Sequence, residues 1–254
     1  MLKTINKTLY ETGDIARFTL RFFRELFKPR LEFSELLRQC YYVGYMSVAL
    51  VAITAFIMGL VITIQSRPTL VEFGAEAWLP KMVSVSLIRE IAPVITALIC
   101  AGKIGSGIGA ELGSMKVTEQ IDAMEVSGTN PFKYLVVTRV LATTLMIPLL
   151  AIFADGIALY GGYLGANLQG VVSWNLWWNQ VFETLKFKDI VPAITKTFFF
   201  GFAIGIIGCY KGFNSEKGTE GVGQSANSAV VIASLLVFII DLLAVQITDI
   251  LDLT

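Results

Sequence analysis

Five long apolar segments constrain the fold of this chain more than any other feature of its sequence. A transmembrane helix needs about 20 predominantly apolar residues to cross the hydrocarbon core of a bilayer. The segments are 43–64, 85–108, 140–168, 190–210 and 229–248. A buried helix of a soluble protein could imitate one such run, but not five. We therefore predict an all-α membrane protein with five transmembrane helices.

The composition excludes several classes of function. Charged residues make up 16% of the 254 residues and the net charge is zero, whereas soluble domains carry about 25% charged residues. A neutral chain has no global field that attracts nucleic acid. The sequence has no histidine, which removes the commonest general base and metal ligand. The three cysteines (Cys40, Cys100 and Cys209) are far apart, so we expect small buried thiols and no disulfide or metal site.

Residues 15–28 have the pattern of an amphipathic helix that precedes the first span. The apolar positions are Ile15, Phe18, Phe22 and Leu26, widened by Phe23 and Phe27, and the basic positions are Arg17, Arg21, Arg24 and Lys28. A basic, aromatic helix of this kind lies in the headgroup layer of a membrane. The alternative is a helix packed on the protein itself. We therefore divide a single domain, 1–254, into an interfacial region (1–42) and a transmembrane region (43–254).

Lysine and arginine are distributed unevenly between the two ends of the predicted spans. Fourteen of the twenty lie in the N-terminal tail and in the segments after spans two and four, and four lie in the opposite loops. Cytoplasmic segments of membrane proteins carry the excess of positive charge. We therefore predict that the N-terminus and 111–134 are cytoplasmic, and that 67–81, 169–188 and the C-terminus are outside. The tryptophan-rich stretch 174–178 then falls in an outer loop, as an interfacial anchor would.

The segment 102–139 is polar, glycine-rich and charged, although it lies between two apolar segments. It contains no GxxxxGK[ST] motif and follows no predicted strand, so we do not interpret it as a phosphate-binding loop. Its small residues instead predict close helix packing near the end of span two. The glycines concerned are Gly102, Gly105, Gly107, Gly109 and Gly113.

A short helix is predicted at 119–127 within this cytoplasmic segment. Thr118 is expected to cap its start, and Gly128 is expected to end it. Its apolar stripe consists of Val117, Ile121 and Met124, and its acidic stripe of Glu119, Asp122 and Glu125. Because a helix this short is marginal in water, we expect it to need a partner surface. The alternative is a connector that packs on its own protein.

Two blocks of sequence carry a resemblance to a known family. The first, 87–142, contains LIREIAPVITALICAGKIGSGIGAELGSMKVTEQIDAMEVSGTNPFKYLVVTRVLA, and the second, 217–231, reads KGTEGVGQSANSAVV. The chain resembles the MlaE-type permeases, the membrane subunits of ABC transporters that move lipids in Gram-negative bacteria, mycobacteria and plastids. The first block is long and ungapped, and the likeness extends over nearly the whole chain. Asp155 departs from the family pattern, which does not lead us to expect a charge in span three.

The resemblance implies a coupling helix, a lipid cavity and a set of partners. The segment around 111–125 is expected to dock on a cytoplasmic ATPase. The coupling residues are expected to be Glu111, Glu119, Gln120, Asp122 and Glu125. A lipid cavity open to the outer side is expected between two copies of the chain. The residues expected beside it on and after span one are Ile62, Gln65, Leu70 and Phe73. The implied partners are an ABC ATPase, a periplasmic MCE-domain lipid-binding protein and a small STAS-domain protein.

Four charged residues lie within the predicted spans, and their charges sum to zero. They are Arg89, Glu90, Lys196 and Asp241. A charge at the centre of a transmembrane helix costs about 2.5–3.5 kcal/mol on insertion scales, so we expect these residues to pair. Counted from the helix ends, all four fall in the outer half of the membrane. They form either an ion-pair network that only fixes helix packing or a polar wall beside the headgroup of a phospholipid.

Together these features predict a homodimeric permease of the bacterial inner membrane. It would move phospholipid or a related lipid between that membrane and a periplasmic MCE-domain carrier, and so contribute to the lipid asymmetry of the outer membrane. The chain has no nucleotide-binding motif, so we expect no enzymatic activity and no cofactor of its own, with ATP and Mg²⁺ bound by the partner ATPase. The sequence gives neither the lipid class nor the direction of transport.

Two other functions remain open at this point. A proton-coupled secondary transporter could use Glu90, Asp155, Lys196 and Asp241 as a relay. Such folds usually contain internal repeats, whereas an odd number of spans without a visible repeat argues against one. A membrane-embedded lipid-modifying enzyme is the second alternative, and it lacks a recognisable nucleophile–base motif.

Overall fold

Five long helical segments run through the structure, which is a computed structural model that describes residues 2–28, 32–168, 172–216 and 218–251. Each segment is long and apolar enough to cross a membrane. They are Phe33–Glu72, Glu76–Val117, Phe132–Asn167, Phe187–Phe213 and Thr219–Ile250. No β-strand occurs among the described residues. The prediction of an all-α protein with five helical segments long and apolar enough to span a membrane is therefore confirmed.

The first span begins earlier than its hydropathy indicates. It consists of α2 (Phe33–Cys40), a π-helical turn (Tyr41–Tyr45) and α3 (Met46–Glu72). The predicted apolar segment began at residue 43, because Glu35, Arg38 and Gln39 lower the hydropathy of α2 although the helix continues through them. The interruption before the first span accordingly lies between Leu26 and Phe33, and not at residue 42.

The second span is a nearly continuous helix with several local geometries. It consists of a 3₁₀ turn (Glu76–Trp78), α4 (Leu79–Ser86), a π-helical turn (Leu87–Ile91), α5 (Ala92–Cys100), a second π-helical turn (Ala101–Gly105) and α6 (Ser106–Val117). The predicted outer loop at 67–81 is therefore mostly helical, and the connection between α3 and the 3₁₀ turn is only 73–75. The short helix α7 (Gln120–Val126) follows at the other end.

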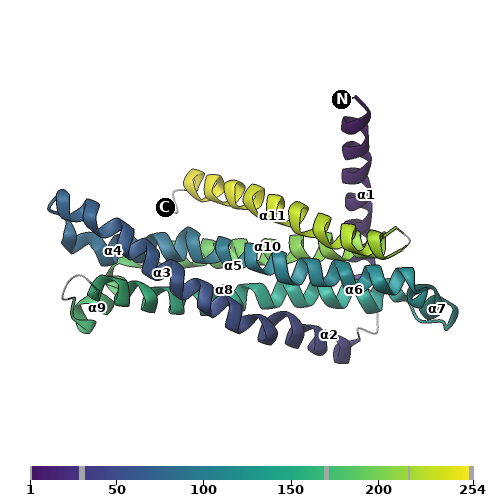
Figure 1. The fold of residues 1–254 in the computed structure, drawn as a ribbon, viewed down its shortest axis with the longest axis horizontal. Helices are drawn as coiled ribbons and strands as arrows, with labels where there is room; N and C mark the ends of the chain where they lie inside the picture. Colours follow the sequence, from purple (N-terminus) through teal and green to yellow (C-terminus); the bar gives the residue numbers. More distant parts are fainter. Residues whose placement is uncertain (1, 29–31, 169–171, 217, 252–254) are drawn as a thin grey trace.

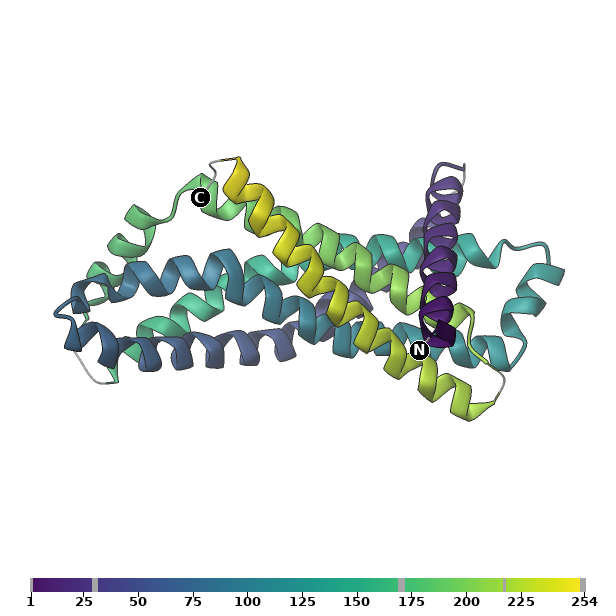
Figure 2. The same ribbon diagram turned by 90° about the horizontal axis from the view of Figure 1, so that it is seen from above.

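The remaining elements complete a bundle whose two ends are easy to distinguish. They are a π-helical turn (Phe132–Val137), α8 (Thr138–Asn167), α9 (Trp174–Thr184), α10 (Phe187–Phe213), α11 (Thr219–Ile250) and, at the N-terminus, α1 (Leu2–Leu26). Helix α7 lies at one end of the long axis, and α9 lies at the other (Figure 1). Helix α1 runs across that axis near the α7 end, whereas α11 crosses the outside of the bundle obliquely (Figures 1 and 2).

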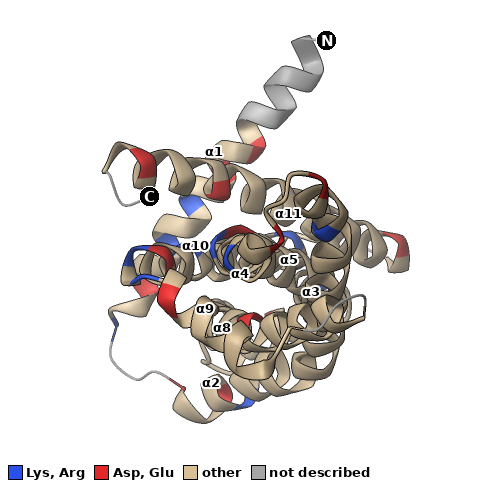
Figure 3. Ribbon diagram, turned by 90° about the vertical axis from the view of Figure 1, so that its left-hand side faces the viewer, with Lys and Arg blue, Asp and Glu red and all other residues tan. Residues whose placement is uncertain are grey.

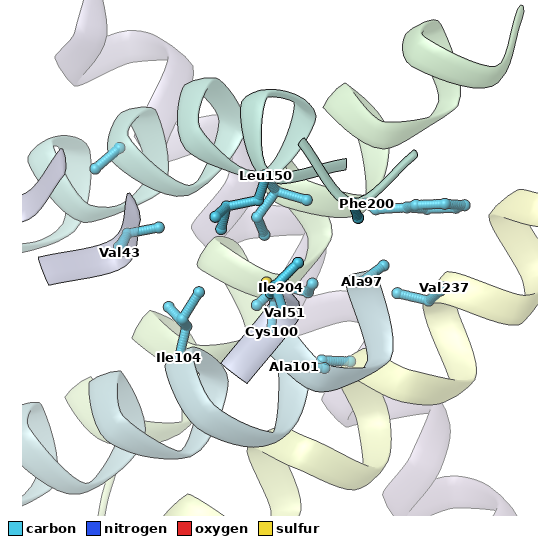
Figure 4. Packing of buried hydrophobic residues seen from close by; sticks show 14 of the residues in the cluster. Val43, Val51, Ala97, Cys100, Ala101, Ile104, Leu150, Phe200, Ile204 and Val237 are labelled. Carbon is cyan, nitrogen blue, oxygen red and sulfur yellow. The ribbon is translucent and has the colours of Figure 1, made fainter. Parts of the chain in front are cut away.

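Small residues allow the central helices to touch backbone to backbone. A Cβ atom added to Gly59 of α3 would lie 2.0 Å from the carbonyl oxygen of Ala158 in α8, so no side chain fits there. Such close approach is the usual way in which transmembrane helices associate. The buried side chains around it come from several spans, among them Val51, Cys100, Leu150 and Ile204, and they pack together in the middle of the bundle (Figure 4).

The glycines of the segment 102–139 divide between two roles. Gly105, Gly109 and Gly113 recur every four residues and face neighbouring helices, as predicted: a Cβ on Gly109 would lie 3.2 Å from Cα of Ala226 in α11. Gly102 and Gly107 have open space where a Cβ would lie, so the prediction of close packing is wrong for these two. They occupy the other side of the same helical segment.

Candidate functional site

Three charged side chains from three spans meet in the half of the bundle nearer α9. The ammonium of Lys196 in α10 donates to Oε2 of Glu90 at 2.6 Å and to Oδ1 of Asp241 in α11 at 2.7 Å. The Lys196 side chain is 4% exposed, whereas Glu90 and Asp241 are 44% and 19% exposed. Because an unpaired ammonium inside a membrane protein is costly, two carboxylates hold it in place. The predicted pairing is confirmed for Lys196, Glu90 and Asp241, whereas the fourth residue of the predicted set, Arg89, has its partner outside that set.

Arg89 forms a separate pair beside this trio. Its Nε donates to Oδ1 of Asp189 at 2.6 Å. The Asp189 side chain is 5% exposed, and its Oδ2 accepts the backbone N–H of Lys186 at 2.8 Å, so it also caps the start of α10. Asp189 is a site residue that the sequence analysis missed, because it immediately precedes the predicted span 190–210. Its position in the first turn of a helix was the available signal.

Two adjoining cavities border these charges. The first has a volume of about 170 Å³ and is lined by Arg89, Glu90, Asp189 and Lys196 among others. The second has a volume of about 450 Å³, lies between α10 and α11, and is lined mainly by apolar side chains. Both are bordered by Pro192, Lys196, Ala244 and Thr248. A charged chamber next to an apolar groove has the polarity that an amphiphile requires.

The residues predicted beside a lipid on span one lie elsewhere in the chain's own fold. Ile62 and Leu70 are half-buried on α3, and Gln65 and Phe73 are exposed. None of the four lines either cavity beside Lys196, and α3 is separated from α11 by the helices of the bundle (Figures 1 and 2). One copy of the chain therefore does not bring the two predicted groups of lipid-site residues together.

Seen end-on from the α9 end, most of the ribbon of the spans carries no charge (Figure 3). Four π-helical turns occur among the described residues. One of them, Leu87–Ile91, carries Arg89 and Glu90. π-helical turns in α-helices are found frequently at functional sites. The irregular geometry of span two thus coincides with the charged site.

At the α7 end, the chain turns out of the direction of α6 at Glu119. This residue has φ of 60° and is the only non-glycine residue with positive φ among those described. The hydroxyl of Thr118 donates to the carbonyl of Ser114 at 2.8 Å, so the prediction that Thr118 caps α7 is wrong. Gly128, with φ of 81°, ends the helix as predicted. The predicted helix at 119–127 is confirmed to within one residue at each end.

Helix α7 has one buried side and one acidic exposed side. Ile121 is 2% exposed and packs into the protein core. Glu119, Gln120, Asp122 and Glu125 are all exposed. Asp122 pairs with Lys116 of α6 at 2.8 Å, and an exposed pair of this kind contributes little to stability. Within the part of the chain that the structure describes, Glu119 and Glu125 form no ion pair.

Glu111 does not share this acidic side. It lies on α6, where its carboxylate pairs with Arg139 at 2.8 Å. Arg139 is 2% exposed, and both side chains line a cavity of about 500 Å³ between α2, α6 and the start of the third span. The five residues predicted for coupling are therefore divided between the exposed side of α7 and this cavity.

Helix α1 packs on the bundle with only part of its apolar surface. The ring of Phe18 contacts that of Phe132 with centroids 4.9 Å apart, and Phe22 is 2% exposed. Leu20 and Phe27 are 69% and 82% exposed. One face of α1 is thus packed on the protein, as the alternative prediction has it. Another face keeps an exposed apolar surface.

A buried carboxylate fixes the end of α1. Glu25 is 6% exposed, and its oxygens accept hydrogen bonds from Lys28 at 2.5 Å and from Nδ2 of Asn130 at 2.9 Å. The bond from the Lys28 ammonium, which favours the ionised carboxylate, holds the pKa of Glu25 below its usual value. Asn130 follows α7 in sequence, so Glu25 connects α1 to the α7 end of the bundle.

Among the described residues, Asp155 of α8 forms no ion pair with any of these groups. It is half-buried, and its Oδ1 has no hydrogen-bond partner among the described residues. It does not join the Lys196 trio, so a proton relay through Glu90, Asp155, Lys196 and Asp241 is not a continuous chain of hydrogen bonds in this structure.

Comparisons with known proteins agree with the resemblance found in the sequence. The family model described as Permease MlaE matches residues 36–247. A protein of Rickettsia typhi named as a probable ABC transporter permease is 38% identical over 233 residues, which cover 92% of this chain and 90% of that protein. The intermembrane phospholipid transport system permease protein MlaE of Haemophilus influenzae is 33% identical over 217 residues, covering 84% of this chain and 83% of that protein.

Proposed function

Because this chain belongs to the MlaE permease family, we propose that it is the membrane subunit of an ATP-driven transporter that moves phospholipid. The proposed route connects the bacterial inner membrane with a periplasmic MCE-domain carrier, and the transport contributes to the lipid asymmetry of the outer membrane. The substrate class is supported by the name of the Haemophilus influenzae relative. The observation that carries the proposal is the Lys196 trio, whose lysine borders both a charged chamber and an apolar groove.

The orientation in the membrane is proposed from the distribution of positive charge. The α7 end carries the large excess of lysine and arginine and is therefore cytoplasmic, so the Lys196 trio lies in the outer half. A double-label experiment tests this. With the native cysteines removed, cysteines introduced at Ser127 and at Ser173 should react with a membrane-impermeant reagent from opposite sides. Reaction from the same side would contradict the orientation.

The exposed side of α7 is proposed as the ATPase dock. Its carboxylates (Glu119, Asp122 and Glu125) face solvent, while Ile121 anchors the helix to the bundle. A short helix held at one side transmits a push from a partner into α6, to which the Lys116–Asp122 pair connects it. The ATPase supplies the nucleotide and the Mg²⁺, and the exposed acidic side supplies complementarity that selects this partner.

The lipid headgroup is proposed to lie in the charged chamber. Arg89 and Lys196 provide positive charge for a phosphate, and the groove between α10 and α11 provides an apolar surface for an acyl chain. A second copy of the chain would complete the cavity by bringing Ile62, Gln65 and Leu70 of α3, and Phe73 directly after it, to its other side. The exposed apolar surface of α11, which includes Phe238, Leu242 and Ile247, is proposed to meet that copy.

Reconstitution tests the function directly. The chain should co-purify with an ATPase, with an MCE-domain protein and with a STAS-domain protein. In liposomes the complex should move a labelled phospholipid to or from the MCE-domain protein only when ATP is present, and equally well when the proton gradient is collapsed. Transfer that needs the proton gradient and not ATP would indicate a secondary transporter. A chemically altered lipid product would indicate an enzyme.

A further inference from the structure

The cavity of about 500 Å³ at the α7 end is a second place where charged side chains gather. It lies between α2, α6 and the start of the third span. Its charged lining residues are Glu35, Arg38, Lys103, Glu111 and Arg139. Lys103 follows Glu90 by thirteen residues along span two, which corresponds to about 20 Å. The cavity is therefore separate from the charged chamber of the proposed function and belongs to the opposite half of the bundle.

The irregular helices of the protein converge on this cavity. Of the four π-helical turns among the described residues, three supply lining residues, namely Tyr41–Tyr45, Ala101–Gly105 and Phe132–Val137. The fourth carries Arg89 and Glu90 of the outer site. Because π-helical turns occur frequently at functional sites, this distribution indicates that the cavity is a second functional site, in addition to the outer one.

The carboxylates in the cavity already have partners, whereas the cations retain unused capacity. Glu111 pairs with Arg139 at 2.8 Å, and Glu35 accepts a hydrogen bond from Gln39 at 2.7 Å and lies 3.7 Å from Arg38. Lys103 donates to the backbone carbonyl of Met46 and has no carboxylate within ion-pair distance among the described residues. The Nε of Arg139 is buried and lacks a partner in the same part of the chain.

Most of the other lining residues are apolar. Val43, Ile104, Ile108 and Leu135 form part of the wall. Tyr41 and Tyr45, next to the cavity on the first span, are 51% and 68% exposed. Exposed aromatic residues of this kind are typical of the level of the lipid headgroups. The occupant that fits is therefore an anion that carries apolar chains and resides at that level.

We infer that this cavity binds the phosphate of an anionic phospholipid from the leaflet at the α7 end, through Lys103 and Arg38, which both line it. The inference goes beyond the proposed function, because that function requires a lipid only at the outer charged chamber. With this second site the protein would bind lipid from each of the two leaflets. Both lipid sites lie where the spans contain π-helical turns.

Site-specific photo-crosslinking in nanodiscs tests the inference. The full chain would carry p-benzoylphenylalanine in place of Tyr42, which lines the cavity, or in place of Tyr45, which is on the same turn and does not. The nanodiscs would contain equal amounts of phosphatidylglycerol and phosphatidylcholine, and mass spectrometry would identify the adducts. The Tyr42 adduct should be enriched in phosphatidylglycerol by about fivefold, the effect of one cation near an anionic lipid. The Tyr45 adduct should follow the bulk ratio.

Charge variants identify the source of the enrichment. Lys103→Gln should return the Tyr42 adduct to the bulk ratio, and Lys103→Arg should keep the enrichment. Lys211→Gln, which removes a cation paired with Glu11 outside the cavity, is the matched control and should change nothing. An unfolding temperature equal to that of the parent shows that Lys103→Gln remains folded.

Four results would overturn the inference. These are an unenriched Tyr42 adduct, enrichment that persists in Lys103→Gln, enrichment that Lys211→Gln removes equally, and adducts to a protein segment in place of lipid. Excess glycerol phosphate distinguishes a lipid from a free phosphate ester. The lipid adduct should survive it, and its loss, a fifth contradicting result, would assign the cavity to a soluble phosphate compound. Phospholipid transfer by the reconstituted complex is a separate readout, so failure here leaves the proposed function standing.

Discussion

The Lys196 trio and the acidic side of α7 are the two charged regions on which the proposed function depends, and they are built in opposite ways. In the trio, a 4% exposed ammonium is held by two carboxylates from two other helices. On α7, Glu119 and Glu125 face solvent and pair with no described residue. The trio therefore gives its ammonium two partners inside the chain, whereas α7 leaves its carboxylates for another molecule. Substitutions in the first should change folding, and substitutions in the second should change partner binding.

The largest effect is expected from Lys196→Met. It leaves Glu90 and Asp241 close together without a cation, and breaking a buried ion pair costs about 3–5 kcal/mol. Thermal unfolding of the purified protein in detergent measures the loss. Lys81→Met is the matched control, because Lys81 pairs with the 72% exposed Glu183 at 3.5 Å and such a pair contributes at most about 1 kcal/mol. Equal stability of the two variants would remove the distinction between buried and exposed charges.

A neutral version of the trio separates folding from transport. Lys196→Met with Asp241→Asn still leaves Glu90 unpaired, so the matched variant needs Glu90→Gln as well. This triple variant should regain the stability of the parent to within about 1 kcal/mol, because no charge is left without a partner. Phospholipid transfer by the reconstituted complex should remain low, since Lys196 no longer attracts a phosphate. Recovery of transfer together with stability would show that the trio is only structural.

A smaller, pH-dependent effect is expected at Glu25, a buried carboxylate near the α7 end that is paired as in the trio. Its pKa is lowered from the usual 4.5 by the hydrogen bond from Lys28. The ionised form therefore stabilises the fold above that usual pKa, and the contribution is lost as the pH falls through the lowered pKa. The difference in unfolding temperature between the parent and Glu25→Gln should be larger at about pH 7 than at about pH 4. A difference that does not change with pH would show that the charge of Glu25 is unimportant.

The sequence predicted the spans well because membrane insertion depends mainly on hydropathy, which is a local property. Its errors fell at the ends of spans. Helix α2 was assigned to the interfacial region because polar residues interrupt its hydropathy, although Gln39 and Glu35 bond to each other within a continuous helix. Thr118 was predicted to cap the start of α7. In the structure the turn before α7 is instead formed by Glu119, which has a positive φ.

The charged site was predicted in part for the same reason. Lys196, Glu90 and Asp241 lie deep in apolar segments, where pairing is the only inexpensive arrangement. Asp189 was not predicted to pair with Arg89, one hundred positions away in sequence, because nothing local distinguishes it from a loop residue. The predicted lipid contacts on and after span one depend on a second copy of the chain, so the fold of a single copy does not form them. The residues concerned are Ile62, Gln65, Leu70 and Phe73.

The most direct test of this account reverses the acidic side of α7. Glu119→Lys, Asp122→Lys and Glu125→Lys together should leave the unfolding temperature nearly unchanged but abolish recovery of the ATPase in a pull-down. The control reverses three exposed acids at the opposite end, Glu72, Glu76 and Glu183, and should retain the ATPase. Two results would contradict the account. The α7 variant could recover as much ATPase as the parent, so that α7 is not the partner-binding region, or it could fail to fold, so that the acidic side of α7 serves stability as the Lys196 trio does.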